Sequence, residues 1–141
     1  MKENWALIYR ELENSPSVVE HLGHSATTPK IFRASQFNIV KEQDHILIFE
    51  TSEGMITEAT PDIREVAFHI TILSKISDVD VEEIGEKLIS ELDGRKITDE
   101  NLNTFDRIYW DNYKSTVAWD EDDKCWFQDL RFRLIVSKKG G

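Results

Sequence analysis

The sequence is poor in the residues that mark a cross-linked scaffold or a nucleotide site: its 141 residues include one cysteine, six glycines and three prolines. Because Cys125 has no second cysteine to pair with, an internal disulfide is excluded, and a reduced cytoplasm suits the chain as well as an oxidising compartment. The glycines are scattered, so they do not form the glycine-rich loop that cradles phosphates. A nucleotide-dependent enzyme is therefore not indicated.

Long apolar runs and positive charge are also scarce. No apolar run approaches the roughly 20 residues of a membrane-spanning helix, and the N-terminus lacks the unbroken apolar core of a signal peptide. We therefore expect a soluble domain that is made in the cytoplasm and has no membrane partner. The 17 Lys and Arg residues face 27 Asp and Glu residues, which gives a formal net charge of −10. Such a surface cannot neutralise many phosphates, so tight binding of nucleic acid is not expected.

The central stretch, residues 64–92, predicts a long strand followed by an amphipathic helix. Apolar residues alternate along the strand and share one face of it: Val66, Phe68, Ile70 and Ile72. After the capping side chains of residues 77–80, apolar residues recur at helical spacing: Val81, Ile84, Leu88 and Leu92. Gly94 follows as a helix-ending glycine. We expect the helix to pack on the apolar face of its own strand.

The other elements complete an α+β fold. Trp5, Ile8, Tyr9 and Leu12 form a helical stripe near the N-terminus. Strands are predicted at residues 31–33, 45–50, 104–110 and 126–137 by β-branched, aromatic and alternating apolar residues. We expect a single domain over residues 1–141, with residues 138–141 frayed. Its mostly antiparallel or mixed β-sheet should have about four to five strands, packed with the N-terminal and central helices.

Two segments are candidates for contact with a partner. Residues 51–62 are polar apart from Met55 and Ile56, and they form either a partner-binding arm or a mobile loop; the sequence leaves both alternatives open. Bulky aromatic residues gather near the C-terminal hairpin: Trp110, Tyr113, Trp119 and Trp126. They belong either to the core and its edges or to an interface with another copy or another protein, where Trp and Tyr are enriched.

The sequence shows acids and histidines, but not in a pattern that indicates catalysis. Four consecutive acids form a run: Asp120, Glu121, Asp122 and Asp123. Because the glycine-centred pattern of a calcium loop is absent, we interpret the run as a solvated hairpin tip. We expect these four acids to contribute charges to the rim of the interface with a partner and to serve assembly rather than folding. His21 and His24 are separated by Gly23 and lack a second ligand pair, and no motif places a nucleophile beside His69. We expect no catalytic residue, no metal ligand and no cofactor.

Taken in order, these elements resemble a known family. They are an N-terminal helix, a proline-containing loop into an edge strand, the strand–helix unit of residues 66–92, the Tyr109-Trp110 pair and the closing strand of residues 129–136. This arrangement resembles the tail terminator, or tail completion, proteins of long-tailed, siphophage-type phages and prophages, the family that includes lambda's minor tail protein U.

The resemblance implies a structural virion protein and not an enzyme. Such a subunit assembles as a six-membered ring, caps the tail tube, ends its polymerisation and offers the surface for head–tail joining. Its partners would be copies of itself, the tail-tube protein and a head-completion or connector protein, and it would be assembled in the host cytoplasm into the virion tail. Six subunits of −10 each carry −60, which would let DNA pass through the ring without specific binding.

Two other classes of function remain open. The acids of residues 120–123 are the candidate ligands if the chain is a small hydrolase or nuclease that uses a divalent ion. The same acidic surface could instead make the chain an adaptor or inhibitor that binds a basic partner. A titration with divalent ions would distinguish the first class, and capture of a basic partner the second.

Overall fold

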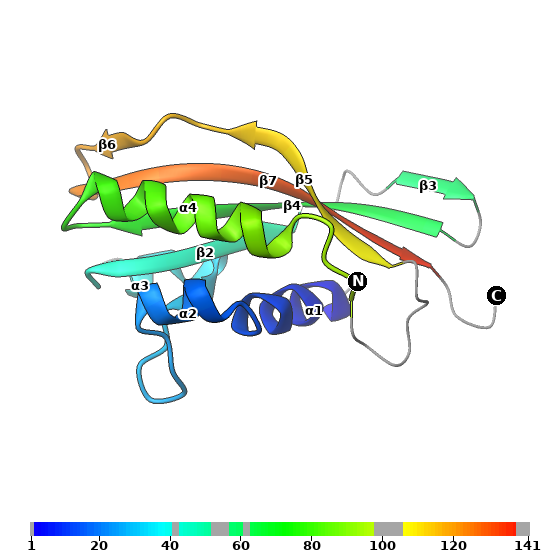
Figure 1. Cartoon of the computed structure of the whole chain (residues 1–141). Helices are drawn as coiled ribbons and strands as arrows, with labels where there is room; N and C mark the ends of the chain where they lie inside the picture. Colours follow the sequence, from blue (N-terminus) through cyan, green and yellow to red (C-terminus); the bar gives the residue numbers. More distant parts are fainter. Residues whose placement is uncertain (1, 41–42, 52–56, 61–62, 98–105, 138–141) are drawn as a thin grey trace.

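Helices come mainly in the first half of the chain and strands follow one another in two runs on either side of the helix of residues 78–92, and the strands gather in one sheet (Figure 1). The computed structural model describes residues 2–40, 43–51, 57–60, 63–97 and 106–137. The helices are α1 (Lys2–Glu13), α2 (Pro16–Leu22), α3 (Phe37–Val40) and α4 (Asp78–Leu92), and the 3-10 turn η1 (Ala34–Gln36) precedes α3. The strands are β1 (Ile31–Arg33), β2 (His45–Thr51), β3 (Thr57–Thr60), β4 (Ile63–Ser74), β5 (Arg107–Lys114), β6 (Ala118–Asp120) and β7 (Cys125–Ser137).

The sheet is mixed and has seven strands. Its order is β1-β2-β4-β7-β5, with β3 paired to β4 and β6 paired to β7. The β1–β2 pair is parallel and the other pairs are antiparallel. The predicted α+β class is confirmed. The additional strands β3 and β6 are four and three residues long, too short to show a period of two in the sequence.

The centre of the sheet is the long antiparallel pair of β4 and β7. Its register runs from Ile63 opposite Ser137 to Ser74 opposite Trp126. Because paired residues project to the same face, the alternating apolar residues of both strands meet on one side. Phe68 and Phe132 stack there with ring centroids 5.5 Å apart, and both are completely buried. The predicted alternation in both strands is confirmed.

Helix α4 covers the apolar face of the sheet, together with α1 and α2 (Figure 1). The side chain of Ser77 caps it by accepting hydrogen bonds from the backbone N–H groups of Val79 and Asp80. The predicted apolar stripe of the helix is buried against β4 and β7, and each such side chain contributes about 1.5–3 kcal/mol when fully buried. The helix therefore packs on its own strand, as predicted.

The opposite face of the sheet is covered only in part by the described residues. A small cluster beneath α3 contains five buried residues: Phe32, Val40, Ile46, Leu73 and Cys125. Further along, the face carries polar side chains of β4, β5 and β7. Cys125 is thus a core residue, and burial raises the pKa of its thiol.

Strand β5 differs from the prediction. It continues past Trp110 to Lys114, with a bulge at which Asn112 has a φ of 55°. The Asp111-Asn112 pair is typical of the end of a strand, because both residue types favour turns. A bulge accommodates both residues without ending the pairing.

Among the described helices, none has the length and apolarity needed to cross a membrane.

Candidate functional site

The acidic tip is a tight turn between β6 and β7, as predicted. One carboxylate oxygen of Asp120 accepts hydrogen bonds from the backbone N–H groups of Asp122, at 2.9 Å, and Asp123, at 3.0 Å. Lys124 completes the turn with a φ of 54°. Asp120 therefore holds the turn together, as an Asx turn does, and the tip presents charge in several directions.

Glu121 is engaged inside the tip as well. Its carboxylate accepts hydrogen bonds from Lys124 Nζ at 2.7 Å and from Trp119 Nε1 at 3.0 Å. The bond from Lys124, and to a smaller extent the bond from Trp119, lowers the pKa of Glu121. The acidic run thus fixes the orientation of an exposed tryptophan beside it.

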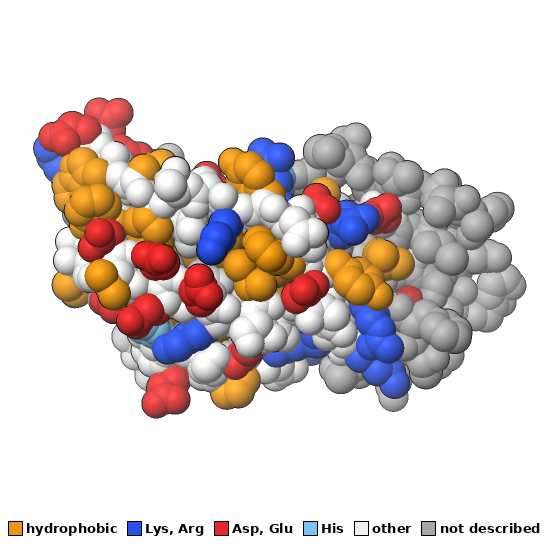
Figure 2. Space-filling view, turned by 45° about the horizontal axis from the view of Figure 1, so that its top comes forward, with side chains coloured by type: hydrophobic (Ala, Val, Ile, Leu, Met, Phe, Trp, Pro, Cys, Tyr) orange, Lys and Arg blue, Asp and Glu red, His pale blue; other side chains and the backbone are white. Residues whose placement is uncertain are grey.

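Exposed apolar side chains lie at the same end of the molecule as the acidic tip. Ile76 is 61% exposed, Val79 is 55% exposed and Trp119 is 41% exposed. Ile76 follows β4, Val79 lies in the first turn of α4, and Trp119 lies on β6. Strand β6 pairs with the start of β7, and the start of β7 also pairs with the end of β4. We call these three residues the end surface. Figure 2 shows hydrophobic side chains beside acidic ones at this end.

The predicted aromatic group is divided between the two faces of the sheet. Trp119 meets the edge of Trp126, with ring centroids 5.1 Å apart, and Trp110 packs against the main core, all on the side of α4. Tyr113 follows the bulge and lies on the opposite face, where the Arg131 guanidinium is 4.2 Å from its ring centre. Trp110 Nε1 donates to the Tyr113 carbonyl across the bulge, at 3.1 Å.

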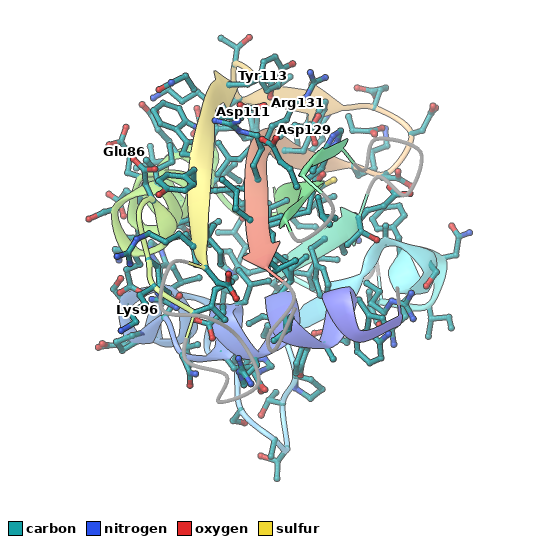
Figure 3. All side chains as sticks on the ribbon, turned by 90° about the vertical axis from the view of Figure 1, so that its right-hand side faces the viewer. Glu86, Lys96, Asp111, Tyr113, Asp129 and Arg131 are labelled. Atoms are coloured by element: carbon teal, nitrogen blue, oxygen red, sulfur yellow. The ribbon has the colours of Figure 1, made fainter. Side chains whose placement is uncertain are left out.

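The polar face of the sheet carries a shallow cleft of about 250 Å³. His69 and Thr71 of β4, Asp129 and Arg131 of β7 and Tyr113 of β5 line it. Thr71 Oγ1 donates to Asp129 Oδ1 at 2.6 Å, so two of the polar groups satisfy each other. In Figure 3, Tyr113, Asp129 and Arg131 lie together on this side, apart from Glu86 on α4.

The two histidines that are close in sequence belong to different networks. His24 Nε2 lies 2.9 Å from Glu13, and His24 Nδ1 accepts the backbone N–H of Lys30, so this ring closes the 24–29 loop. His21 Nε2 instead lies 3.3 Å from one carboxylate oxygen of Asp80. His21 and His24 therefore have different partners, although they are three residues apart in the sequence.

Asp80 is the centre of a cluster that the sequence did not indicate. Its second oxygen lies 3.1 Å from His45 Nε2. Hydrogen bonds from His45 and then from His21 lower the pKa of Asp80. Glu83 lies one turn further along α4, and ligand atoms of His21, Asp80 and Glu83 lie within 4.8 Å of one another. Among the described residues, these three side chains are spaced closely enough to hold one metal ion, whereas the acids of the tip are not part of such a group.

The structure leaves part of the predicted interface undescribed. Met55 and Ile56 lie outside the described residues. No family model matches the sequence, and no curated protein matches it.

Proposed function

We propose that this chain is the tail terminator of a long-tailed phage or prophage. As a structural virion protein it would form a homo-oligomeric ring of six subunits, cap the tail tube, end tube polymerisation and provide the surface for head–tail joining. Copies of the chain, the tail-tube protein and a head-completion or connector protein would be its partners. Its place would be the virion tail, and no catalytic step is part of the proposal.

The end surface is the observation that carries this proposal. A ring subunit needs an exposed apolar area that a neighbour covers, and exposed apolar side chains rimmed by polar ones are typical of protein interfaces. Trp119 provides such a side chain in contact with the acidic tip, and Ile76 and Val79 provide two more at the same end of the molecule. The resemblance was drawn from the order of elements predicted in the sequence, and the helices and strands of the structure follow a compatible order, which also supports the proposal.

The net charge supports a ring that surrounds DNA. Each subunit has a formal charge of −10, so a ring of six has −60. A channel whose wall shares this acidic character would repel phosphates, and DNA would move through it without binding.

The test combines a double substitution with an assembly assay. We expect Ile76→Asp with Val79→Asp to leave the monomer folded, since both side chains are exposed and, at position 79, Asp is favourable in the first turn of α4. The same variant should lose ring formation, or capping of tail-tube polymers, because it places unpaired charges in an apolar contact. Light scattering after size-exclusion chromatography, alone and with tail-tube protein, measures assembly, and electron microscopy measures tube length.

Ile39→Asp is the matched control. Ile39 is 83% exposed but lies on α3, which packs on the opposite face of the sheet. We expect this variant to assemble as the original protein does. An original protein that stays monomeric both alone and with tail-tube protein, and leaves tube length unlimited, would refute the proposed function.

A further inference from the structure

We propose that His21, Asp80 and Glu83 form a binding site for a divalent transition-metal ion of the Zn²⁺ class. The site lies between α2, which supplies the histidine, and the first turns of α4, which supply both carboxylates. An ion bound there would link two helices that are about 60 residues apart in the sequence. This inference does not depend on the proposed function.

The spacing of the ligands follows from the fold. Asp80 and Glu83 are three residues apart on one helix, so their side chains project from the same side of α4. His21 reaches them from α2, and its Nε2 lies 3.3 Å from Asp80 Oδ1. Two ligands each about 2.0–2.1 Å from a tetrahedral Zn²⁺ are separated by roughly this distance. Asp80 and His21 therefore need little movement to share one ion.

The surroundings of Asp80 resemble the outer contacts of a metal site. His45 Nε2 holds the second carboxylate oxygen at 3.1 Å, which orients the first oxygen toward His21. Outer hydrogen bonds of this kind position metal ligands and raise metal affinity. His21 and Asp80 are partly buried and Glu83 is exposed, which leaves the remaining coordination positions open to water.

The donor set favours a transition ion over calcium or magnesium. One imidazole nitrogen and two carboxylates suit Zn²⁺ and its neighbours, whereas Ca²⁺ and Mg²⁺ prefer oxygen ligands throughout. We expect Zn²⁺ and Co²⁺ to bind more tightly than Ca²⁺ or Mg²⁺.

Lys87 competes with the ion for this site. Its Nζ lies 2.9 Å from His21 Nδ1, and an ammonium can only donate, so in this structure Nδ1 is the acceptor and Nε2 carries the proton. Coordination through Nε2 requires the proton to move to Nδ1, which breaks the contact with Lys87. Removal of the lysine should therefore strengthen metal binding.

Calorimetric titration of the full chain with Zn²⁺ tests the site. We expect one ion per chain, and at least tenfold weaker binding in Asp80→Asn, Glu83→Gln and His21→Gln. Lys87→Met should bind more tightly than the original protein. In nitrogen NMR, the protonated nitrogen of His21 should change from Nε2 to Nδ1 when Zn²⁺ is added.

His24→Gln is the matched control, because His24 also pairs with a carboxylate but belongs to another network. It should bind Zn²⁺ as the original protein does. The near-isosteric Asp80→Asn and Glu83→Gln variants limit structural damage, and their circular dichroism and melting temperature show whether they are folded. Equal binding by the original protein and a folded Asp80→Asn variant would overturn the proposal, as would an unchanged His21 tautomer at saturating Zn²⁺.

Discussion

Gly85 marks the closest approach of α4 to the sheet, and its substitution gives a sharp test of the packing. A Cβ atom added at this position would lie 2.5 Å from Gln128 Oε1 and 3.5 Å from Ile72 Cδ1. The Ile72 contact is ordinary, but the Gln128 side chain must move. Gln128 is buried, and its Nε2 donates at 2.9 Å to the carbonyl of Ser115, in the link between β5 and β6. Gly85→Ala therefore disturbs the hydrogen bond that ties β7 to the link between β5 and β6.

Two opposing effects set the size of the change in unfolding free energy that Gly85→Ala causes. Alanine is favoured over glycine inside a helix by about 1 kcal/mol. Moving Gln128 breaks its hydrogen bond to the half-buried Ser115 and leaves the buried Gln128 amide unsatisfied, which costs about 1–3 kcal/mol. In the original background we expect Gly85→Ala to lower the free energy of unfolding by up to about 2 kcal/mol. In a Gln128→Ala background the obstacle is gone, so the same substitution should stabilise by about 1 kcal/mol.

Urea denaturation of the four proteins measures this change of sign. Tryptophan fluorescence and circular dichroism should give coincident transitions with equal m-values, which justifies the two-state comparison. The coupling energy between the two positions then follows from a double-mutant cycle. If Gly85→Ala has the same sign in both backgrounds, Gln128 does not limit the approach of α4.

Two further predictions concern charged groups in the helical layer. Arg95 Nη1 lies 3.6 Å from a carboxylate oxygen of Glu11, which is 2% exposed, and it donates to the Glu11 carbonyl at 2.6 Å. Arg10 Nε lies 3.5 Å from the other carboxylate oxygen and remains as a partner of Glu11. Arg95→Ala should therefore cost about 1–3 kcal/mol of unfolding free energy, and a loss below about 1 kcal/mol in urea denaturation would contradict this. Because the folded-state pKa of Asp80 is lowered, its contribution to stability is present above the usual carboxyl pKa of 3.8 and is lost as the pH falls through the lower folded value. The difference in unfolding free energy between the original protein and Asp80→Asn, measured by denaturation across this pH range, should decrease as the pH falls. A difference that stays constant would show that the histidine contacts do not lower the pKa of Asp80.

The elements with long periodic patterns could be predicted from the sequence, and the physical reason is burial. Strand β4 and helix α4 each face the core with one side, so the period of two in the strand and the period of 3.6 in the helix appear directly in the residues. The same reasoning predicted the closing strand β7 from the alternation of Leu130, Phe132, Leu134 and Val136, all of which are buried.

The sequence did not reveal features that depend on register or on contacts between distant segments. Tyr113 is three residues after Trp110, so the alternation of a strand already places it on the opposite face; the bulge inserts Asp111 and Asn112 and shifts the pairing, so that Tyr113 lies opposite Arg131. The Asp80 cluster brings together side chains from α2, β2 and α4. Its local signal was limited to Asp80 and Glu83 on one side of a helix, where acids are usually solvated.

The end surface and the proposed metal site are close in sequence but can be perturbed separately. Val79 and Asp80 are consecutive, yet the first side chain is 55% exposed and the second is held between two histidines. Consecutive residues of a helix point about 100° apart, so a contact that covers Val79 need not cover Asp80. Ile76→Asp alone should therefore weaken assembly without changing Zn²⁺ affinity, whereas Glu83→Gln should weaken Zn²⁺ binding and leave assembly intact. Loss of both properties in either variant would mean that the two sites are a single surface.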